Sequence, residues 1–382
     1  MADPALPYGV DREGHVVVRV GDQVLDLVEA TGLDVGPDVW SSGSLNAFFR
    51  EGPDAWFTTR GELIATLHRQ PARALRPLSE VPLVLPFEVG DYTDFYASRE
   101  HATAMGRLLR PGEDPLPAAW LHLPMGYHGR AGTVVVSGSP IPRPSGLVAG
   151  PDGPVYGPTA RLDVEVELGF VVGRGVPRGH RLAAADAEAH IFGLVVVNDW
   201  SARDIQAFEY RPLGPFLGKS FATSISPWVV PLAALDCCRV EGPVQDPPPR
   251  GYLKVAEPRG LDVELTLAVN GAVLSRIPAR HLYWSMAQQL AHLTANGAGC
   301  RAGDLFASGT ISGPEPGTAG SLMELFQGRR WLEDGDVVDI TATAGAGEME
   351  LGVVSGTVVP WDQTWDPSCH HARDRSWGRE DR

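Results

Sequence analysis

The sequence lacks the features that mark several large classes of protein. No run of about 18 apolar residues occurs, so we expect no membrane-spanning segment. The first residues contain no apolar stretch long enough for a signal peptide. The motifs GxSxG and HExxH, a Walker loop and a GxGxxG after a strand are also missing, which argues against the common hydrolase and nucleotide-binding folds.

Cysteine and positive charge are both scarce. The four cysteines form no CxxC pair, which argues against a structural zinc site, and they fit a reducing compartment, so we expect a cytoplasmic protein. Lys and Arg number 32 against 47 Asp and Glu, a net charge of −15. This charge repels a phosphate backbone, so the sequence predicts neither nucleic acid nor a membrane as partner.

Glycine and proline are abundant instead, with 44 and 33 residues spread along the chain. Short apolar segments between such turns predict a mainly β protein. We expect a small N-terminal unit over residues 1–88, a larger unit over 89–367 and a polar tail over 368–382. Gly21-Asp22 and Asn270-Gly271 are typical of hairpin turns. Helices are predicted near the residues 44–49, 55–67, 183–189 and 281–295.

Three acidic residues alternate with apolar ones in the segment Leu162–Leu168. On a strand, Asp163, Glu165 and Glu167 would share one face. Two interpretations stay open. The acids lie on a solvated outer face, or they bind a hard cation such as Ca²⁺ or Mg²⁺, which prefers carboxylate oxygens.

Another acidic residue, Asp199, lies at the end of the apolar strand predicted at residues 190–198. The next twenty residues carry a guanidinium, an amide, a phenol and an ammonium group, with glycines between them: Arg203, Gln206, Tyr210 and Lys219. An ordinary charged loop is the alternative. The variety of polar groups beside an apolar strand favours a functional site.

A third segment, Gly90–Ala102, contains Asp94, Tyr96 and His101 at short spacings, and the glycine-rich stretch Gly126–Arg130 follows it. A single histidine in such a segment is more often structural than catalytic. Here the short spacings from Asp94 and Tyr96, and the glycine-rich stretch that follows, keep a catalytic role for His101 open.

Four stretches together resemble the fumarylacetoacetase (fumarylacetoacetate hydrolase) family, and the likeness runs from about Leu6 to Trp361. They are Gly90–His101, Trp120–Arg130, Asn198–Thr223 and Ala307–Pro316. The resemblance implies a mainly β fold, with a small SH3-like N-terminal barrel, a larger β-roll domain with few helices, and a homodimer. It also implies a metal-dependent hydrolase. Such an enzyme cleaves a carbon–carbon bond of 4-fumarylacetoacetate with water, giving fumarate and acetoacetate in the last step of tyrosine and phenylalanine catabolism.

The resemblance also assigns roles to individual residues. The metal-binding acids are Asp94, Glu165, Glu167 and Asp199. Asp163 shares their predicted strand face but is not among the family's ligands. A second cation site involves Asp199, Lys219 and Thr223. The cofactor implied is Ca²⁺, Mg²⁺ or both.

For the chemistry, the resemblance implies that His101 is the general base and that Glu324 is its carboxylate partner. Arg203, Gln206 and Lys219 would stabilise developing negative charge. The small-molecule diketo acid would contact Tyr96, Arg110, Tyr127, Gln206, Tyr210 and Thr310.

Alternatives remain at this point. A related acylpyruvate hydrolase, another β-diketo acid hydrolase or an oxaloacetate-type decarboxylase would share the metal acids, but these enzymes are generally shorter. A metal-binding protein without catalysis is a different class, against which His101 and Glu324 both argue. The segment Cys237–Glu257 and the residues after Trp361 are not matched by the resemblance.

Overall fold

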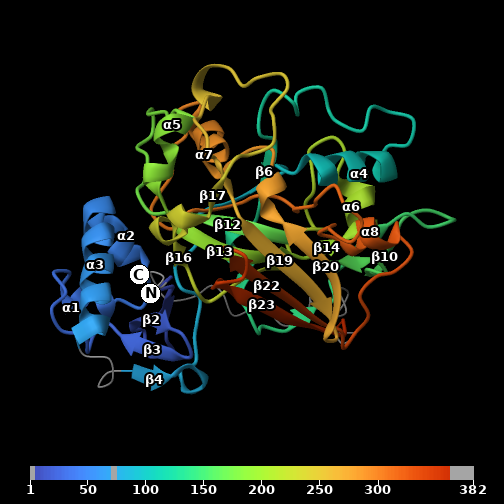
Figure 1. The fold of residues 1–382 in the computed structure, drawn as a ribbon. Helices are drawn as coiled ribbons and strands as arrows, with labels where there is room; N and C mark the ends of the chain where they lie inside the picture. The colour runs from blue at the N-terminus through green and yellow to red at the C-terminus, as the bar shows by residue number, and fades with distance from the viewer. Residues whose placement is uncertain (1–4, 70–74, 362–382) are drawn as a thin grey trace, which may run out of the picture.

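The structure is a computed structural model that describes residues 5–69 and 75–361. Figure 1 shows a small N-terminal unit, drawn in blue, beside a larger unit built mainly from strands. The prediction of a mainly β protein is therefore confirmed. The polar tail predicted for residues 368–382 lies outside the described residues.

The N-terminal unit contains an antiparallel sheet whose strands follow one another in chain order. These are β1 (Tyr8–Val10), β2 (Val16–Val20), β3 (Gln23–Asp26) and β4 (Leu75–Pro77). Gly21 has a φ of 62° in the predicted turn between β2 and β3, a conformation that glycine adopts without strain. The chain between β3 and β4 is helical: α1 (Pro37–Trp40), α2 (Asn46–Glu51) and α3 (Pro53–Arg69), with η1 (Leu78–Glu80) after β4.

A central sheet carries most of the predicted site residues. In sheet order its strands are β6 (Gly126–His128), β5 (Tyr92–Phe95), β21 (Leu305–Ala307), β12 (Val166–Val172), β13 (Ile191–Asp199), β15 (Thr223–Ile225) and β7 (Val134–Val136), and β16 (Val230–Pro231) also pairs with β13. The β5–β21 and β15–β7 pairs are parallel. Because β5 and β21 are far apart in the sequence, this pairing joins the start of the larger unit to a segment more than 200 residues later.

A second sheet packs against the central one. Its order is β20 (Ala272–Pro278), β19 (Val263–Val269), β22 (Val337–Ala344), β23 (Met349–Val359) and β8 (Ile141–Pro142). The predicted Asn270-Gly271 turn joins β19 to β20, and both residues have positive φ, 51° and 75°. The smaller pairs are β9 (Ser145–Val148) with β10 (Val155–Pro158), β11 (Leu162–Asp163) with β14 (Ser201–Ala202), and β17 (Arg239–Val240) with β18 (Gly260–Leu261).

The two faces of β13 lie in different apolar clusters. Leu194 and Val196 join the cluster between the two sheets. Val195 and Val197 instead join a cluster with side chains of the N-terminal unit, such as Tyr8. Both faces of β13 are therefore buried, as expected for an apolar strand at the centre of a sheet.

Helices of the larger unit are few and lie at its periphery. They are α4 (Arg99–Leu109), α5 (Ala184–Ala187), α6 (Arg203–Glu209), α7 (Met286–Thr294) and α8 (Leu322–Phe326), with the short 3₁₀ helices η2 (Ala131–Thr133), η3 (Glu188–His190), η4 (Leu232–Cys238), η5 (Gly251–Leu253) and η6 (Ala279–His281).

The helix predicted at 281–295 begins later than expected, because Ser285 caps it. The Ser285 hydroxyl accepts from the Gln288 amide, and the Gln288 side chain accepts from the Ser285 amide. This reciprocal capping box defines the first turn. Within the described residues, no helix combines the length and the apolar character that crossing a membrane requires.

Candidate active site

Four buried carboxylates converge where strands of the central sheet end. Asp94 lies in β5, Glu167 in β12 and Asp199 at the end of β13, while Glu165 directly precedes β12. The Asp199 amide donates to the Glu165 carbonyl at 3.1 Å, which brings the end of β13 beside the start of β12. One carboxylate oxygen of each of the four lies within 4.8 Å of the others.

Two of these carboxylates have oxygens without donors. Among the described residues, Asp94 Oδ1 and both Glu167 oxygens are buried and have no hydrogen-bond partner. Burial, followed by the charge of neighbouring acids such as Asp199, raises the pKa of both groups well above the usual value. Buried acceptors without donors, one group on β5 and one on β12, fit a hard divalent cation that binds through oxygen.

The other two carboxylates already face positive charge. Lys219 Nζ contacts Glu165 Oε2 and lies 2.5 Å from Asp199 Oδ2. Arg203 Nη1 lies 2.7 Å from Glu165 Oε1. Burial alone would raise the pKa of Glu165, but Arg203 and Lys219 lower it below its usual value. Glu165 is therefore held ionised beside the two uncompensated acids.

Lys219 and Thr223 both contact Asp199, as the predicted second cation site requires. Thr223 Oγ1 donates to Asp199 Oδ1 at 2.7 Å. Burial would lower the pKa of Lys219, but the Asp199 and Glu165 carboxylates raise it above its usual value. A protonated amine has no lone pair. The Lys219 side chain therefore balances charge here, and only its backbone oxygen could ligate a cation.

His101 and Glu324 meet although 223 residues separate them in the sequence. His101, in the first turn of α4, places Nδ1 at 2.7 Å from Oε2 of Glu324 in α8, and both side chains are buried. Burial would raise the pKa of Glu324, but His101 lowers it below the usual value. Glu324 thus holds the proton on Nδ1 and leaves Nε2 as the basic atom of the neutral imidazole.

Two serines that were not among the predicted site residues bond to Glu324. Ser312 Oγ donates to its Oε1 at 3.0 Å, and Ser321 Oγ donates to its Oε2 at 2.7 Å. Ser321 also caps α8 by accepting from the Glu324 amide. The pattern Ser321-x-x-Glu324 before a helix is a capping-box signature, which could have identified Ser321 from the sequence.

Four of the predicted substrate contacts lie beside these groups. The Tyr127 hydroxyl donates to Asp199 Oδ2 at 2.9 Å, and Gln206 Oε1 accepts from Arg203 Nη1 at 3.1 Å. The Tyr96 ring stands edge-on to the His101 ring, with centroids 5.5 Å apart. Among the described residues, Thr310 Oγ1 is a buried hydroxyl without a hydrogen-bond partner. It is a polar group that a ligand could satisfy.

The other two predicted substrate contacts have different partners in this structure. Arg110 Nη2 donates to the Pro115 carbonyl at 3.0 Å. The Tyr210 hydroxyl accepts from Arg211 Nε at 2.8 Å, and Arg211 in turn reaches Glu113 at 3.4 Å. Their roles toward a substrate stay predictions.

Asp163 is not part of the four-carboxylate cluster that contains Glu165 and Glu167. It belongs to β11, which pairs with β14, and the strand order is interrupted before β12 begins at Val166. Asp163 Oδ2 lies 2.8 Å from Arg203 Nε. All three acids are buried, so the interpretation of a solvated outer face is wrong. Val164 alone separates β11 from the bridge residue Glu165, and Arg203 bonds to both Asp163 and Glu165.

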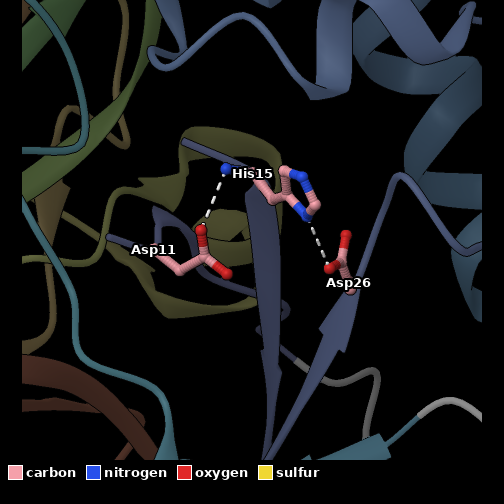
Figure 2. A group of neighbouring side chains, drawn as sticks. All are labelled: Asp11, His15 and Asp26. Atoms are coloured by element: carbon pink, nitrogen blue, oxygen red, sulfur yellow. Dashed lines mark hydrogen bonds and ion pairs between the residues drawn. The ribbon is translucent and has the colours of Figure 1, made fainter. Parts of the chain in front are cut away.

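Figure 2 shows another group of potential cation ligands, Asp11, His15 and Asp26, in the N-terminal unit. His15 Nδ1 lies 2.9 Å from Asp26 Oδ2, and this hydrogen bond raises the pKa of His15. Arg76 Nη2 lies 3.2 Å from Asp11 and 3.5 Å from Asp26. Because a guanidinium already compensates the two carboxylates, the group is an ion-pair network and does not require a cation.

A cavity of about 200 Å³ opens on the carboxylate cluster and is lined by Tyr127, Asp199, Phe216, Lys219 and Thr223 among others. A larger cleft, of about 720 Å³, lies between α2 and the turn Gly173–Gly175. None of the predicted site residues line it. The smaller cavity brings together the Asp199 carboxylate, the Lys219 ammonium and the Tyr127 phenol, and this chemistry places the site there.

Comparison with known proteins agrees with this geometry. The family models described as "Fumarylacetoacetase N-terminal" and "Fumarylacetoacetate (FAA) hydrolase C-terminal" match residues 5–86 and 91–359. Fumarylacetoacetase from Homo sapiens is 44% identical over 93% of this chain and 95% of its own length. The protein of that name from Caenorhabditis elegans is 42% identical over 94% of this chain and 96% of its own.

Among solved structures, a fumarylacetoacetate hydrolase from Exiguobacterium antarcticum superposes with a TM-score of 0.60. It is 19% identical and covers 93% of this chain and 99% of its own, so it supports the fold alone. The family models span most of the chain, and the relatives are similar over nearly all of it. The chain therefore belongs to the fumarylacetoacetate hydrolase family.

Proposed function

We propose that this protein hydrolyses 4-fumarylacetoacetate to fumarate and acetoacetate, the last step of tyrosine and phenylalanine catabolism. The observation that carries the proposal is the buried His101–Glu324 pair, 2.7 Å apart, beside a cluster of four carboxylates. Relatives named fumarylacetoacetase from animals and plants, such as that of Arabidopsis thaliana at 40% identity, support this substrate.

Asp94, Glu165, Glu167 and Asp199 would hold Ca²⁺ or Mg²⁺, whose geometry the residues present do not distinguish. A bound divalent cation would supply Lewis-acid stabilisation of the enolate charge that develops on the departing fragment. The partnerless oxygens of Asp94 and Glu167 support the proposal, because they are acceptors that no protein donor in the described structure satisfies.

His101 removes a proton from the attacking water through Nε2. Its Nδ1 proton stays on the hydrogen bond to Glu324, so the imidazolium that forms is stabilised by a carboxylate with a lowered pKa. Ser312 and Ser321 hold that carboxylate in place. The same imidazolium then returns the proton to the departing carbon, which restores the base.

Arg203, Gln206 and Lys219 stabilise the negative charge on the attacked carbonyl oxygen. Among the described residues, Arg203 Nη2 is a buried donor without a partner, although Nε and Nη1 of the same guanidinium are both occupied. A preorganised donor of this kind typically lowers the barrier by about 3–4 kcal/mol. Tyr96, Arg110, Tyr127, Tyr210 and Thr310 would bind the polar ends of the diketo acid.

A purified-protein assay tests the proposal. Ultraviolet absorbance of fumarylacetoacetate should fall as the diketone is cleaved, and fumarate and acetoacetate should appear in equal amounts. His101→Ala is the control for a contaminating activity. A panel of acylpyruvates and other β-diketo acids tests the alternative, and faster turnover of an acylpyruvate than of fumarylacetoacetate would contradict our assignment.

We further propose that the protein is a cytoplasmic homodimer. The described cysteines, Cys237, Cys238 and Cys300, are free thiols, which supports a reducing compartment. Apolar side chains are exposed after α6, among them Leu213 at 95% and Phe216 at 63%, and a second copy could cover them. Light scattering after size exclusion tests the dimer, and a monomer at micromolar concentration would contradict it.

A further inference from the structure

Asp163 is a buried carboxylate that neither belongs to the cation cluster nor faces solvent. Its relative exposure is 0%. Oδ2 accepts from Arg203 Nε at 2.8 Å, and Oδ1 accepts from the backbone amide of Leu322 at 2.8 Å. The Met323 amide lies 3.3 Å from Oδ2. One side chain therefore bonds to the guanidinium of Arg203 and to the first residues of α8.

We propose that Asp163 is a positioning residue that holds Arg203 and α8 in a fixed relation, and so aligns the charge-stabilising donor with the general-base pair. The inference rests on the proposed function, because it assigns Asp163 a part in that reaction. It adds a residue that touches neither the base nor the reacting atoms, but that fixes two of the groups that do.

The orientation of Arg203 depends on Asp163. Its guanidinium bridges two carboxylates, Asp163 through Nε and Glu165 through Nη1. A planar guanidinium held at two of its nitrogens has its remaining nitrogen fixed in direction. Without Asp163, Arg203 would keep only Glu165 as a charged partner and would be free to rotate about that contact. The partnerless Nη2 would then lose its orientation.

The helix α8 has only five residues and carries Glu324. So short a helix has little stability of its own, so its place depends on contacts at its ends. The backbone around Ser321 pairs with the segment before β12, through the Glu165–Ser321 bridge and the Val166 amide on the Gly320 carbonyl at 2.9 Å. Asp163 adds a charged acceptor for the next two amides.

Through these contacts Asp163 connects Arg203 with the helix that carries Glu324. On one side is the donor that stabilises charge, and on the other is the carboxylate that orients His101. Both depend on a single buried side chain from β11.

Asp163→Asn tests the inference, because the amide keeps the volume and removes the charge. We expect kcat to fall roughly 10- to 100-fold, the size typical for residues that orient groups in a metal site. KM should change little and bound cation, measured by elemental analysis, should stay stoichiometric. An unchanged kcat, or loss of the cation, would overturn the proposal.

A matched control separates positioning from stability. Asp26 is also a buried carboxylate; it faces His15 and Arg76, accepts from the Val28 amide at 2.9 Å, and lies at the end of β3 in the N-terminal sheet (Figure 2). Asp26→Asn should lower the melting temperature and leave kcat unchanged at temperatures where it is folded. An equal fall of kcat in both variants would mean that Asp163 has only a structural role.

A double-mutant cycle tests the path to the base. If Asp163 acts through α8, its effect on kcat should shrink in a Glu324→Gln background, because the group it aligns is already impaired. Full additivity of the two effects would contradict the α8 half of the proposal.

A second variant keeps the test decisive if Asp163→Asn does not fold. Leu322→Pro removes the amide that bonds Asp163 but keeps the carboxylate, and proline is tolerated at the first position of a helix. Ser321 already has the extended conformation that a residue before proline requires, φ −138° and ψ 153°. We expect a fall in kcat with the cation retained, and an unchanged kcat would contradict the proposal.

All ratios are measured on the β-diketo acid that the wild-type protein cleaves. Failure of the wild type to cleave fumarylacetoacetate would therefore reject the proposed substrate. It would leave the comparison of Asp163→Asn with wild type to decide the positioning role separately.

Discussion

The four carboxylates of the cluster are buried, and the neighbouring charges differ from one carboxylate to another. Asp94 and Glu167 have raised pKa values because burial and neighbouring acids oppose their ionisation. Glu165 has a lowered pKa because Arg203 and Lys219 outweigh its burial. The protein thus compensates the charge of Glu165 and Asp199 and leaves Asp94 and Glu167 for a cation, and single substitutions should separate these roles.

Asp199→Ala should remove the cation and nearly all activity while the protein stays folded. Asp199 supplies one of the four clustered oxygens and accepts from Thr223, Tyr127 and Lys219. Elemental analysis of the purified variant measures the bound metal, with Asp26→Asn as a control for general damage. Stoichiometric metal in Asp199→Ala would show that the ligand assignment is wrong.

Arg110→Gln should mainly raise KM, by roughly tenfold or more, as expected for the loss of a hydrogen bond between charged groups. The contact would exist in both the ground state and the transition state, so kcat should change little. Steady-state kinetics on the diketo acid give both constants. A large fall in kcat at constant KM would instead place Arg110 in the chemical step.

His101→Ala should lower kcat about 10²- to 10⁴-fold, the usual contribution of a general base, and should leave the cation bound. Glu324→Gln should lower it less, because Glu324 orients the imidazole and does not take the water proton. An unchanged kcat, or loss of the metal, in His101→Ala would contradict the assignment of His101 as the base.

At the scale of secondary-structure elements, the site depends on the close approach of β5 to the chain after β21. Gly309 follows β21 with a φ of 73°, and a Cβ at this position would lie 2.0 Å from the Phe95 carbonyl oxygen. Asp94 and Thr310 lie on either side of this contact. Backbone that passes so close to a neighbouring strand admits only glycine.

Gly309→Ala should therefore destabilise the protein by more than the roughly 1–2 kcal/mol that a left-handed conformation alone costs. Gly317→Ala is the matched control, since Gly317 has a φ of 79° but open space where its Cβ would lie. Thermal or denaturant unfolding compares the two variants. Equal losses of stability would show that the backbone around Gly309 relaxes without cost.

For the whole molecule, the cation should contribute to the stability of the fold. The acids of the cluster come from β5, β12 and β13, so a cation bound to them would join three strands of the central sheet. It would also remove the repulsion that raises the pKa of Asp94 and Glu167. Binding stabilises only the state that contains the site, which is the folded one.

Chelation should lower the melting temperature, and saturating Ca²⁺ or Mg²⁺ should restore it. At a hundredfold excess of cation over Kd, the free energy of unfolding should rise by about 3 kcal/mol. Without cation, the folded chain binds protons on Asp94 and Glu167 that the unfolded chain releases. Its stability should therefore fall as pH rises from the ordinary carboxyl range toward the raised pKa values. Unfolding of chelated and cation-loaded protein measured across this range tests the sign, and a stability that rises with pH in the chelated protein would contradict it.

Much of the architecture and several site residues could be predicted from the sequence. Turn pairs such as Asn270-Gly271 act locally, because positive φ at both positions joins adjacent strands without help from the rest of the fold. The expectation of neither a nucleic-acid nor a membrane partner came from net charge and apolar runs, which are properties of the chain itself, and it stays a prediction. The roles of the metal acids came from the resemblance and not from their spacing.

Tertiary structure alone decided what each acid faces. Alternation at period two grouped Asp163 with Glu165 and Glu167, but Asp163 is not in the four-carboxylate cluster. It bonds to Arg203, which also pairs with Glu165, and to amides of α8. Periodicity describes which side of a strand a residue occupies, not which distant segment covers that side. The meeting of His101 with Glu324 across 223 residues is of the same kind. Such contacts form only in the folded protein, because they depend on packing between segments that are distant in the sequence and whose local patterns do not indicate one another.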